Sequence, residues 1–286
     1  MIPYHRPMKI KIDFSDILNS GQFSNGKYCR ELEERIGRMY NCKVYVCSSG
    51  TQGLLLSIFV FDGAFRTISM PAFNWWSDMY ICKLMDIKIE YKDINPKTWL
   101  TKKESTNLRL HTFGSCDPYP TDVIFDGTHA LGTKLKNLGK ATILSLAPTK
   151  LITAGEGGII LLKEPSEEIR ELRDRCSRMS EFHAKIGLSY LEHLTQILLW
   201  KEKVFKYYKN NLEGQFQEVP FHSNYNTIGM LTDLKIPKEI EVKQYYEPLY
   251  RGLKNTDYVY SKIVCLPSWL GAPYKKIVDL INEKNK

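Results

Sequence analysis

The chain has 286 residues, of which 43% are hydrophobic and 25% are charged. These are ordinary values for a folded globular protein, and they exclude a largely disordered chain, a collagen-like repeat and a coiled coil. No apolar run approaches the ~20 residues of a membrane-spanning helix, and the N-terminal residues contain no apolar signal core. We therefore expect a cytoplasmic protein without a membrane segment.

The formal net charge of +8 could serve nucleic acid, a membrane surface or a small anionic substrate. The basic residues are dispersed, however, and the cluster that contains aromatic residues, Lys201 to Lys209, has the pattern of an amphipathic helix. The sequence thus favours a solvated basic surface and no nucleic-acid partner. Seven cysteines without a C-x-x-C spacing indicate neither a disulfide framework nor a zinc site, and we expect no metal.

Over residues 1–165, short β-rich runs alternate with helical stretches. The runs are mostly continuous in hydrophobicity, which is typical of strands covered on both faces. The predicted helices are Thr51–Val60 and Asn74–Leu84, and the predicted strands are Lys43–Cys47, Thr67–Met70, Ile87–Tyr91, Arg109–Phe113, Val123–Phe125, Thr142–Leu146 and Gly158–Leu162. We expect an α/β fold with a mostly parallel sheet of about seven strands and helices on both faces.

The pattern changes after Pro165. Ser166 is expected to cap a helix that carries acidic residues in its first turn. A long helical stretch from about Met179 to Asn211 and a final helix at Lys275–Glu283 follow, with a few strands between them. We therefore place a domain boundary near residue 165, with a large domain over 1–165 and a smaller α+β domain over 166–286.

Polar side chains stand directly after two of the predicted strands. Where Ser48-Ser-Gly-Thr51 opens a helix, the first backbone N–H groups and the Thr51 hydroxyl could hold a phosphate, although Ser-Gly-Thr is also an ordinary helix cap. Asp126 ends another strand at the sheet edge where open α/β folds bind ligands. It could cap a helix, bind a metal or pair with a cationic nitrogen; a metal is disfavoured because His129 is the only other strong ligand nearby.

Lys150 follows a third strand, in an apolar segment before a glycine-rich turn. Alone, it could be a lysine whose ammonium reaches the surface. Burial would lower its pKa, as an imine-forming amine requires. A phosphate-binding helix start, an aspartate and a partly buried lysine, each just beyond a strand, together suggest pyridoxal phosphate.

An ordered set of segments makes this suggestion more specific, because the sequence resembles the pyridoxal-phosphate-dependent sugar aminotransferases of the DegT/StrS family, which have the aspartate-aminotransferase fold type I. The similarity covers nearly the whole chain. The segments that carry it are Ile2–Tyr4, Ser20–Gly26, Glu31–Glu34, Ser48–Thr51, Pro71–Trp75, Asp93–Pro96, His111–Gly114, Asp126–Gly132, Ser145–Lys150, Gly155–Gly158, Arg178–Phe182 and Tyr245–Leu249.

The resemblance implies a role for each matching residue. Lys150 corresponds to the lysine that binds the cofactor covalently and then moves the proton, and Asp126 to the carboxylate that keeps the pyridine nitrogen protonated. Trp75 corresponds to the aromatic residue stacked on the ring, and His129 to the residue beside the ring oxygen. Three residues correspond to the phosphate site, namely Gly50, Thr51 and Ser145.

The sequence departs from the family pattern in its second half. Family members have a loop before an asparagine that reaches the cofactor phosphate of the partner subunit; here that loop is missing and Cys176 stands at the asparagine's position. A thiol is a poor donor, so the contact across the dimer is in doubt. Tyr250 replaces a histidine of the substrate site. The chain is a short member, and most of the missing length belongs to the second domain.

The leading hypothesis is therefore transfer of an amino group from a donor such as L-glutamate to a nucleotide-linked keto-sugar, for an amino sugar of a surface polysaccharide or a secondary metabolite. A homodimer is the expected state. One alternative keeps the cofactor but changes the reaction or uses a non-sugar ketone; Lys150 argues against a dehydratase, whose relatives have histidine there. A further alternative is a catalytically degenerate relative that serves as a binding or regulatory module.

Overall fold

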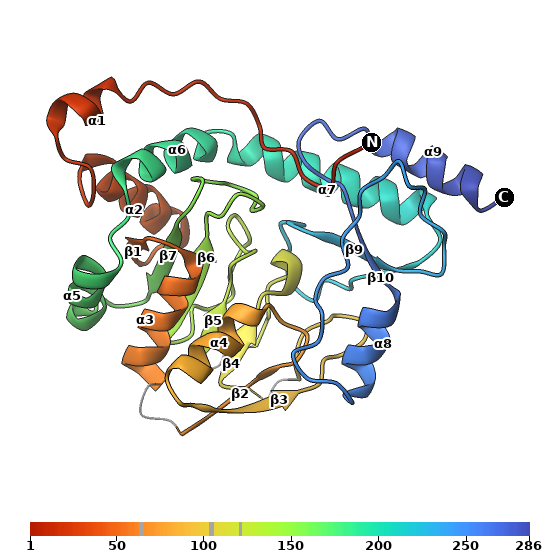
Figure 1. Ribbon diagram of the computed structural model, residues 1–286, viewed down its shortest axis with the longest axis horizontal. Helices are drawn as coiled ribbons and strands as arrows, with labels where there is room; N and C mark the ends of the chain where they lie inside the picture. Colours follow the sequence, from red (N-terminus) through yellow and green to blue (C-terminus); the bar gives the residue numbers. More distant parts are fainter. Residues whose placement is uncertain (63–65, 103–105, 120–121) are drawn as a thin grey trace.

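The computed structural model describes residues 1–62, 66–102, 106–119 and 122–286 (Figure 1). In its first part the predicted strand positions are largely confirmed. The strands are β1 (Lys43–Cys47), β2 (Thr67–Pro71), β3 (Lys88–Lys92), β4 (Leu108–Leu110), β5 (Ile124–Asp126), β6 (Ala141–Ser145) and β7 (Gly158–Leu162). The helices are α1 (Ser15–Ser20), α2 (Lys27–Tyr40), α3 (Gly50–Asp62) and α4 (Trp76–Leu84), with a 3-10 turn at Thr112–Gly114. β4 ends earlier than expected because the chain enters this turn, where Phe113 has a φ of 59°.

Three of the five described pairings among β1 to β7 are parallel, as predicted, but the prediction of one sheet of about seven strands needs correction. The described strands form a five-stranded ladder in the order β1-β7-β6-β5-β4 and a two-stranded parallel ladder of β2 and β3. Strand β7 runs antiparallel to both of its neighbours. The physical reason is the connection from β6 to β7, residues 146–157, which contains no helix and returns the chain directly, whereas parallel neighbours need a crossover along the sheet.

The two ladders meet at β4, where Asn107 joins them. Its backbone N–H donates to Ser69 O at 3.0 Å, and its side-chain oxygen accepts from Ser69 N–H at 3.1 Å. The side chain thus takes the place of a backbone ladder bond, and β2 lies beside β4 (Figure 1). This junction depends on the hydrogen bonds of one side chain, which the hydrophobic periodicity of a sequence cannot predict.

Helices cover both faces of the five-stranded ladder, as predicted. Alternate residues of β6 and β7 enter two separate cores: Leu144 and Ile159 pack with residues of α2 and α6, whereas Ile143 and Ile160 pack with residues of α3 and α4. Both faces are therefore dry. Because both faces are covered by apolar side chains, polar side chains can gather only at the ends of the strands. We therefore expect a site there.

The second part of the chain contains α5 (Glu167–Cys176), α6 (Glu181–Leu191), α7 (Leu194–Asn211), α8 (Lys254–Lys262) and α9 (Tyr274–Lys284), with strands β8 (Gln215–Phe216), β9 (Ile228–Leu231) and β10 (Ile263–Leu266). The Ser166 cap is confirmed, since its hydroxyl accepts from Ile169 N–H at 3.2 Å. The long helical stretch predicted from about Met179 to Asn211 consists of two helices rather than one. The helix ends at Leu191 and restarts at Leu194, with a tight bond from His193 N–H to Tyr190 O at 3.0 Å.

The three strands β8, β9 and β10 form a small antiparallel sheet whose residues pack with α7 and α9 in a separate core. The N-terminal residues lie against this part, because Ile2 bridges to Ile240. As a result, Tyr4 and its neighbours reach the region between the larger sheet and the smaller one. The domain boundary near residue 165 stays a prediction.

A close backbone approach fixes the start of α3 against the sheet. Gly158, the first residue of β7, pairs with Cys47 of β1 and Ser145 of β6. A Cβ atom on Gly158 would lie 2.2 Å from Ser49 O and 2.7 Å from Gly50 N, both backbone atoms. Only glycine allows this contact, which brings the first turn of α3 beside the end of β6.

Gly158→Ala should therefore lower the free energy of unfolding by about 1–3 kcal/mol, because the added methyl group must displace backbone. Gly187→Ala is the matched control: a Cβ atom there, inside α6, would meet Ala154 Cβ at an ordinary 3.5 Å. The control should be neutral or raise the free energy of unfolding by up to ~1 kcal/mol. Urea denaturation of both variants measures the difference, and equal stabilities would contradict this account of Gly158.

Candidate active site

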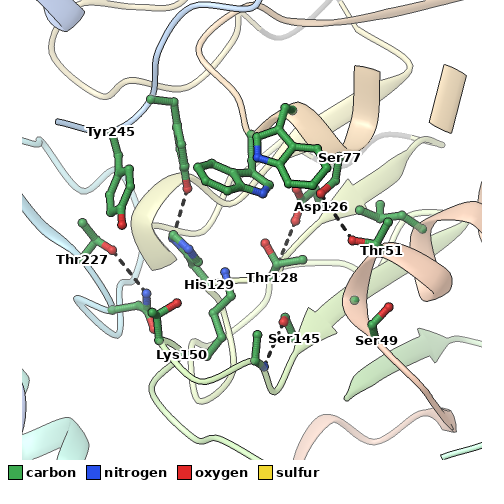
Figure 2. Close-up of a pocket in the computed structure, with 18 of the residues that line it drawn as sticks. Ser49, Thr51, Ser77, Asp126, Thr128, His129, Ser145, Lys150, Thr227 and Tyr245 are labelled. Carbon is green, nitrogen blue, oxygen red and sulfur yellow. Dashed lines mark hydrogen bonds between the residues drawn. The ribbon is translucent and has the colours of Figure 1, made fainter. Parts of the chain in front are cut away.

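A cavity of about 320 Å³ lies at the strand ends, and the structure brings together around it every residue predicted for the site. Figure 2 shows side chains from the start of α3, the end of β5 and the loop after β6 converging on one space. The predicted residues that line it are Gly50, Thr51, Trp75, Asp126, His129, Ser145 and Lys150. Sequence analysis did not single out several other lining residues, among them Tyr4, Ser49, Ser77, Thr128, Glu156, Asn226, Thr227, Tyr245 and Tyr246.

The first turn of α3 forms one wall of the cavity. Ser49 caps the helix, because its side-chain oxygen accepts from Gln52 N–H at 3.1 Å. A Cβ atom on Gly50 would lie 3.0 Å from Ser145 Cβ and 3.3 Å from Thr128 Cγ2, so the helix start is packed tightly against the strand ends. The backbone N–H groups of a first turn have no partners within the helix. With the hydroxyls of Thr51 and Ser145, they form a group of donors suited to an anion.

Asp126 stands at the end of β5 and is 6% exposed. Its carboxylate accepts from Thr128 N–H at 2.9 Å. Burial raises the pKa of Asp126, while hydrogen bonds from Thr128 and the charge of Lys150 oppose that rise. Asp78 lies buried nearby, and its pKa is raised well above the usual range by burial and by the charge of Asp126. Burial of two neighbouring carboxyls would be eased by a positive charge placed in the cavity.

Lys150 occupies the loop between β6 and β7 and is partly buried. The next residue is fixed, because Leu151 N–H donates to the Asn226 side chain at 2.9 Å. Burial lowers the pKa of Lys150 to about 8, although the charges of Asp126 and Glu156 act in the opposite direction. About a tenth of this amine is therefore unprotonated at pH 7, far more than for an ordinary lysine, and the unprotonated form is the one that attacks a carbonyl carbon.

The remaining wall is aromatic. Trp75 precedes α4 and is 43% exposed, with its ring centroid 6.1 Å from that of Tyr245 and 6.4 Å from that of Tyr246. The hydroxyl of Tyr246 lies 3.2 Å from His129 Nδ1. Burial and the positive charges of Lys150 and Lys201 lower the pKa of His129, so its imidazole is neutral at pH 7.

Among the lining residues that the sequence did not indicate, Tyr246 contacts a predicted site residue through its hydroxyl. It is 117 positions from His129, and no spacing rule connects them. The one sequence signal for Tyr246 is its place in the segment Tyr245–Leu249, which carries part of the family resemblance.

Cys176 and Tyr250, the two departures from the family pattern, are exposed and do not line the cavity.

No cluster of three or more potential metal ligands occurs within the described ranges. In the same part of the chain, every helix is too short or too polar to span a bilayer. The side chains that line the cavity offer donors for a phosphate, a carboxylate for a cationic nitrogen, an amine and a flat aromatic face. These donors fit a phosphorylated pyridine that carries a carbonyl group.

The proteins that this chain resembles are consistent with a site for such a group. The model of the "DegT/DnrJ/EryC1/StrS aminotransferase family" matches residues 8–108 and 115–275. The dTDP-4-amino-4,6-dideoxy-D-glucose transaminase of Shigella dysenteriae is 22% identical over 336 aligned positions, which cover 91% of each chain. The GDP-perosamine synthase of Vibrio cholerae is 23% identical over 310 positions, which cover 90% of this chain and 83% of that one.

The fold is also that of solved aminotransferases. PseC of Helicobacter pylori, an aminotransferase involved in the biosynthesis of pseudoaminic acid, superimposes with a TM-score of 0.86 at 17% identity, over 99% of this chain and 98% of that one. This likeness shows the fold, and the family model, which covers most of the sequence, shows the relationship. The chain belongs to the DegT/DnrJ/EryC1/StrS family of pyridoxal-phosphate-dependent aminotransferases.

Proposed function

We propose that this chain uses pyridoxal phosphate to transfer an amino group from L-glutamate to a nucleotide-linked keto-sugar. The observation that carries the proposal is the convergence of Lys150, Asp126 and the first turn of α3 on one cavity. The sugar acceptor is supported by the relatives, whose names are those of enzymes of dTDP- and GDP-linked amino sugars. The product would be an amino sugar for a polysaccharide or a secondary metabolite.

Each predicted residue receives a task in this proposal. The first turn of α3, with Thr51 and Ser145, binds the phosphate of the cofactor through N–H and O–H donors. Asp126 would pair with the pyridine nitrogen and keep it protonated. Trp75 would offer a flat face to the ring, and neutral His129, oriented by the Tyr246 hydroxyl, would serve the ring oxygen. When bound, the cofactor supplies an electron sink that stabilises negative charge on the substrate carbon.

Lys150 carries the proton chemistry. As a neutral amine, Lys150 would hold the cofactor covalently. Once the substrate amine has taken its place, the same nitrogen would be free to take the proton from the substrate carbon. Its lowered pKa suits both tasks near neutral pH. Because the donor and the acceptor use one site in turn, we expect ping-pong kinetics.

The assembly and the location are also part of the proposal. A homodimer in the cytoplasm is expected from the family resemblance. The exposed position of Cys176 at the end of α5 agrees with a surface that a second subunit could cover. Ser177, next to it, accepts from Ser48 N–H at 3.0 Å, which ties this surface to the segment that leads into α3.

The lowered pKa of Lys150 predicts how covalent capture of the cofactor depends on pH. The rate at which the cofactor-free protein captures pyridoxal phosphate should rise with an apparent pKa of about 8 and then level off, since protonated amine does not react below it. Asp126→Asn should move the profile to lower pH, because the Asp126 charge raises the pKa of Lys150. Stopped-flow absorbance measures both profiles; a wild-type rate that still climbs near pH 10 would contradict the assignment.

The amino transfer itself can be tested with labelled L-glutamate. Wild-type protein loaded with pyridoxal phosphate should release 2-oxoglutarate in one equivalent per site without an acceptor. In the reverse direction, dTDP-4-amino-4,6-dideoxy-D-glucose and GDP-perosamine are the amino-sugar probes. Lys150→Ala should reduce both reactions by at least about 10³-fold, because the nucleophile and proton carrier are lost.

Lys140→Ala is the control for that experiment, since Lys140 is paired with Asp62 outside the cavity. It should retain wild-type rates. Release of a dehydrated sugar without 2-oxoglutarate would replace the proposal with another reaction of the same cofactor. Protein that takes up no pyridoxal phosphate would favour a binding or regulatory role.

A further inference from the structure

A second cavity, of about 50 Å³, adjoins the candidate active site. Tyr4, Thr149, Lys150 and Asn226 line both cavities, so the smaller one shares a wall with the candidate active site that includes Lys150. A water-sized group needs roughly 10–15 Å³ of such space. The second cavity therefore accommodates a group of three or four heavy atoms and excludes a sugar ring or a nucleotide.

Lys201 of α7 is the buried cation of this cavity, with 8% of its surface exposed. Its ammonium donates to Asn226 O and to Ser268 Oγ, each at 2.8 Å. An ammonium has three protons to donate. Across the described ranges the structure gives Lys201 no carboxylate partner. One donor and the whole charge are thus left for a group that is not part of the described chain.

Asn226 links this lysine to Lys150. Its backbone oxygen accepts from Lys201, and its side-chain oxygen accepts from the N–H of Leu151 at 2.9 Å, directly after Lys150. Asn226 therefore joins the Lys201 ammonium to the backbone next to Lys150, and it lines both cavities.

The walls of the second cavity carry positive charge and no acidic side chain. The Arg6 guanidinium lies 5.0 Å above the ring of Trp269, and His5 contributes a buried Nε2 atom without a hydrogen-bond partner. Burial lowers the pKa of Lys201 to about 7. A buried cation that lacks a counter-charge is costly, and an anion in the cavity would remove that cost.

We propose that the second cavity binds the α-carboxylate of the amino donor, with Lys201 as its counter-ion. The inference rests on the proposed function, since it assumes that an amino acid delivers its amine at Lys150. An α-carboxylate has three heavy atoms and is bonded to the carbon that carries the amine. Its size and its charge therefore match the small basic cavity, and its bond to the amine-bearing carbon matches the lining, Lys150 included, that this cavity shares with the candidate active site.

Lys201 would select amino acids as donors without contributing to the sugar reaction. An amino sugar has no carboxylate next to its amine, so it cannot use this charge. The reaction with the donor and the reaction with the acceptor should consequently respond differently to the loss of Lys201. Glutamate and alanine, which share only the α-amino acid group, should respond alike.

The experiment compares single-turnover reactions of the loaded enzyme. In Lys201→Met and Lys201→Gln, kcat/KM for L-glutamate and for L-alanine should fall by about 10- to 100-fold, the loss expected for a hydrogen bond to a charged group. The reverse reaction with dTDP-4-amino-4,6-dideoxy-D-glucose should stay within about twofold of wild type. Lys203→Met, which changes an exposed lysine of the same helix, is the matched control and should alter neither reaction.

Two variants at position 201 and a binding measurement distinguish a carboxylate site from a purely structural role of Lys201. If Lys201→Met does not fold, Lys201→Gln still removes the charge while retaining a donor; recovery of wild-type rates in it would reduce Lys201 to a structural hydrogen bond and overturn the proposal. Equal losses with glutamate and with the amino sugar would also overturn it.

Calorimetric titration with 2-oxoglutarate separates this proposal from the proposed function. Binding that weakens by the same 10- to 100-fold in Lys201→Met supports the carboxylate site even if wild-type protein transfers no amine, in which case the proposed function alone fails. Wild-type transfer from glutamate together with unchanged 2-oxoglutarate binding in Lys201→Met leaves the proposed function intact and rejects the role of Lys201.

Discussion

The site depends on one steric constraint, the contact of Gly158 with the backbone of Ser49 and Gly50. Because β7 pairs with both β1 and β6, this contact fixes the start of α3 against the end of β6. Ser145 is thereby placed beside Gly50, and the N–H groups of the first turn face the cavity that Asp126 and Lys150 line. The donors of the site are thus positioned by backbone packing, which leaves little freedom for them to move apart.

Burial then sets the chemistry of the charged groups. It raises the pKa of Asp126 and lowers that of Lys150, while the attraction between the two charges moderates both shifts. A pyridinium nitrogen against Asp126 would satisfy the carboxylate, and a partly neutral amine at Lys150 is ready to react. The same reasoning applies to Lys201, whose charge no acidic side chain of the second cavity balances. Charges without partners in a dry site mark the places where ligands complete the structure.

Much of this arrangement could be predicted from the sequence. The parts that were predicted wrongly, or not at all, have physical reasons. Strands such as β6 and β7 were predicted because both of their faces are buried, which produces continuous apolar runs. The antiparallel direction of β7 was not predicted, because it depends on the path of the loop between β6 and β7. The break between α6 and α7 at Glu192 and His193 lacks glycine or proline and left no signal. Local motifs identified Asp126 and Lys150, whereas Tyr246 and Lys201 reach the two cavities from distant elements and could be found only in three dimensions.

The central claim is that Lys150 is the amine that binds pyridoxal phosphate in this cavity. Borohydride reduction of the loaded protein, followed by peptide mass spectrometry, tests it most directly. The account predicts one pyridoxyl group per chain on the peptide that contains Lys150, and none on that peptide in Lys150→Ala. A label on Lys201 or on a surface lysine, or no stable label at all, would contradict it.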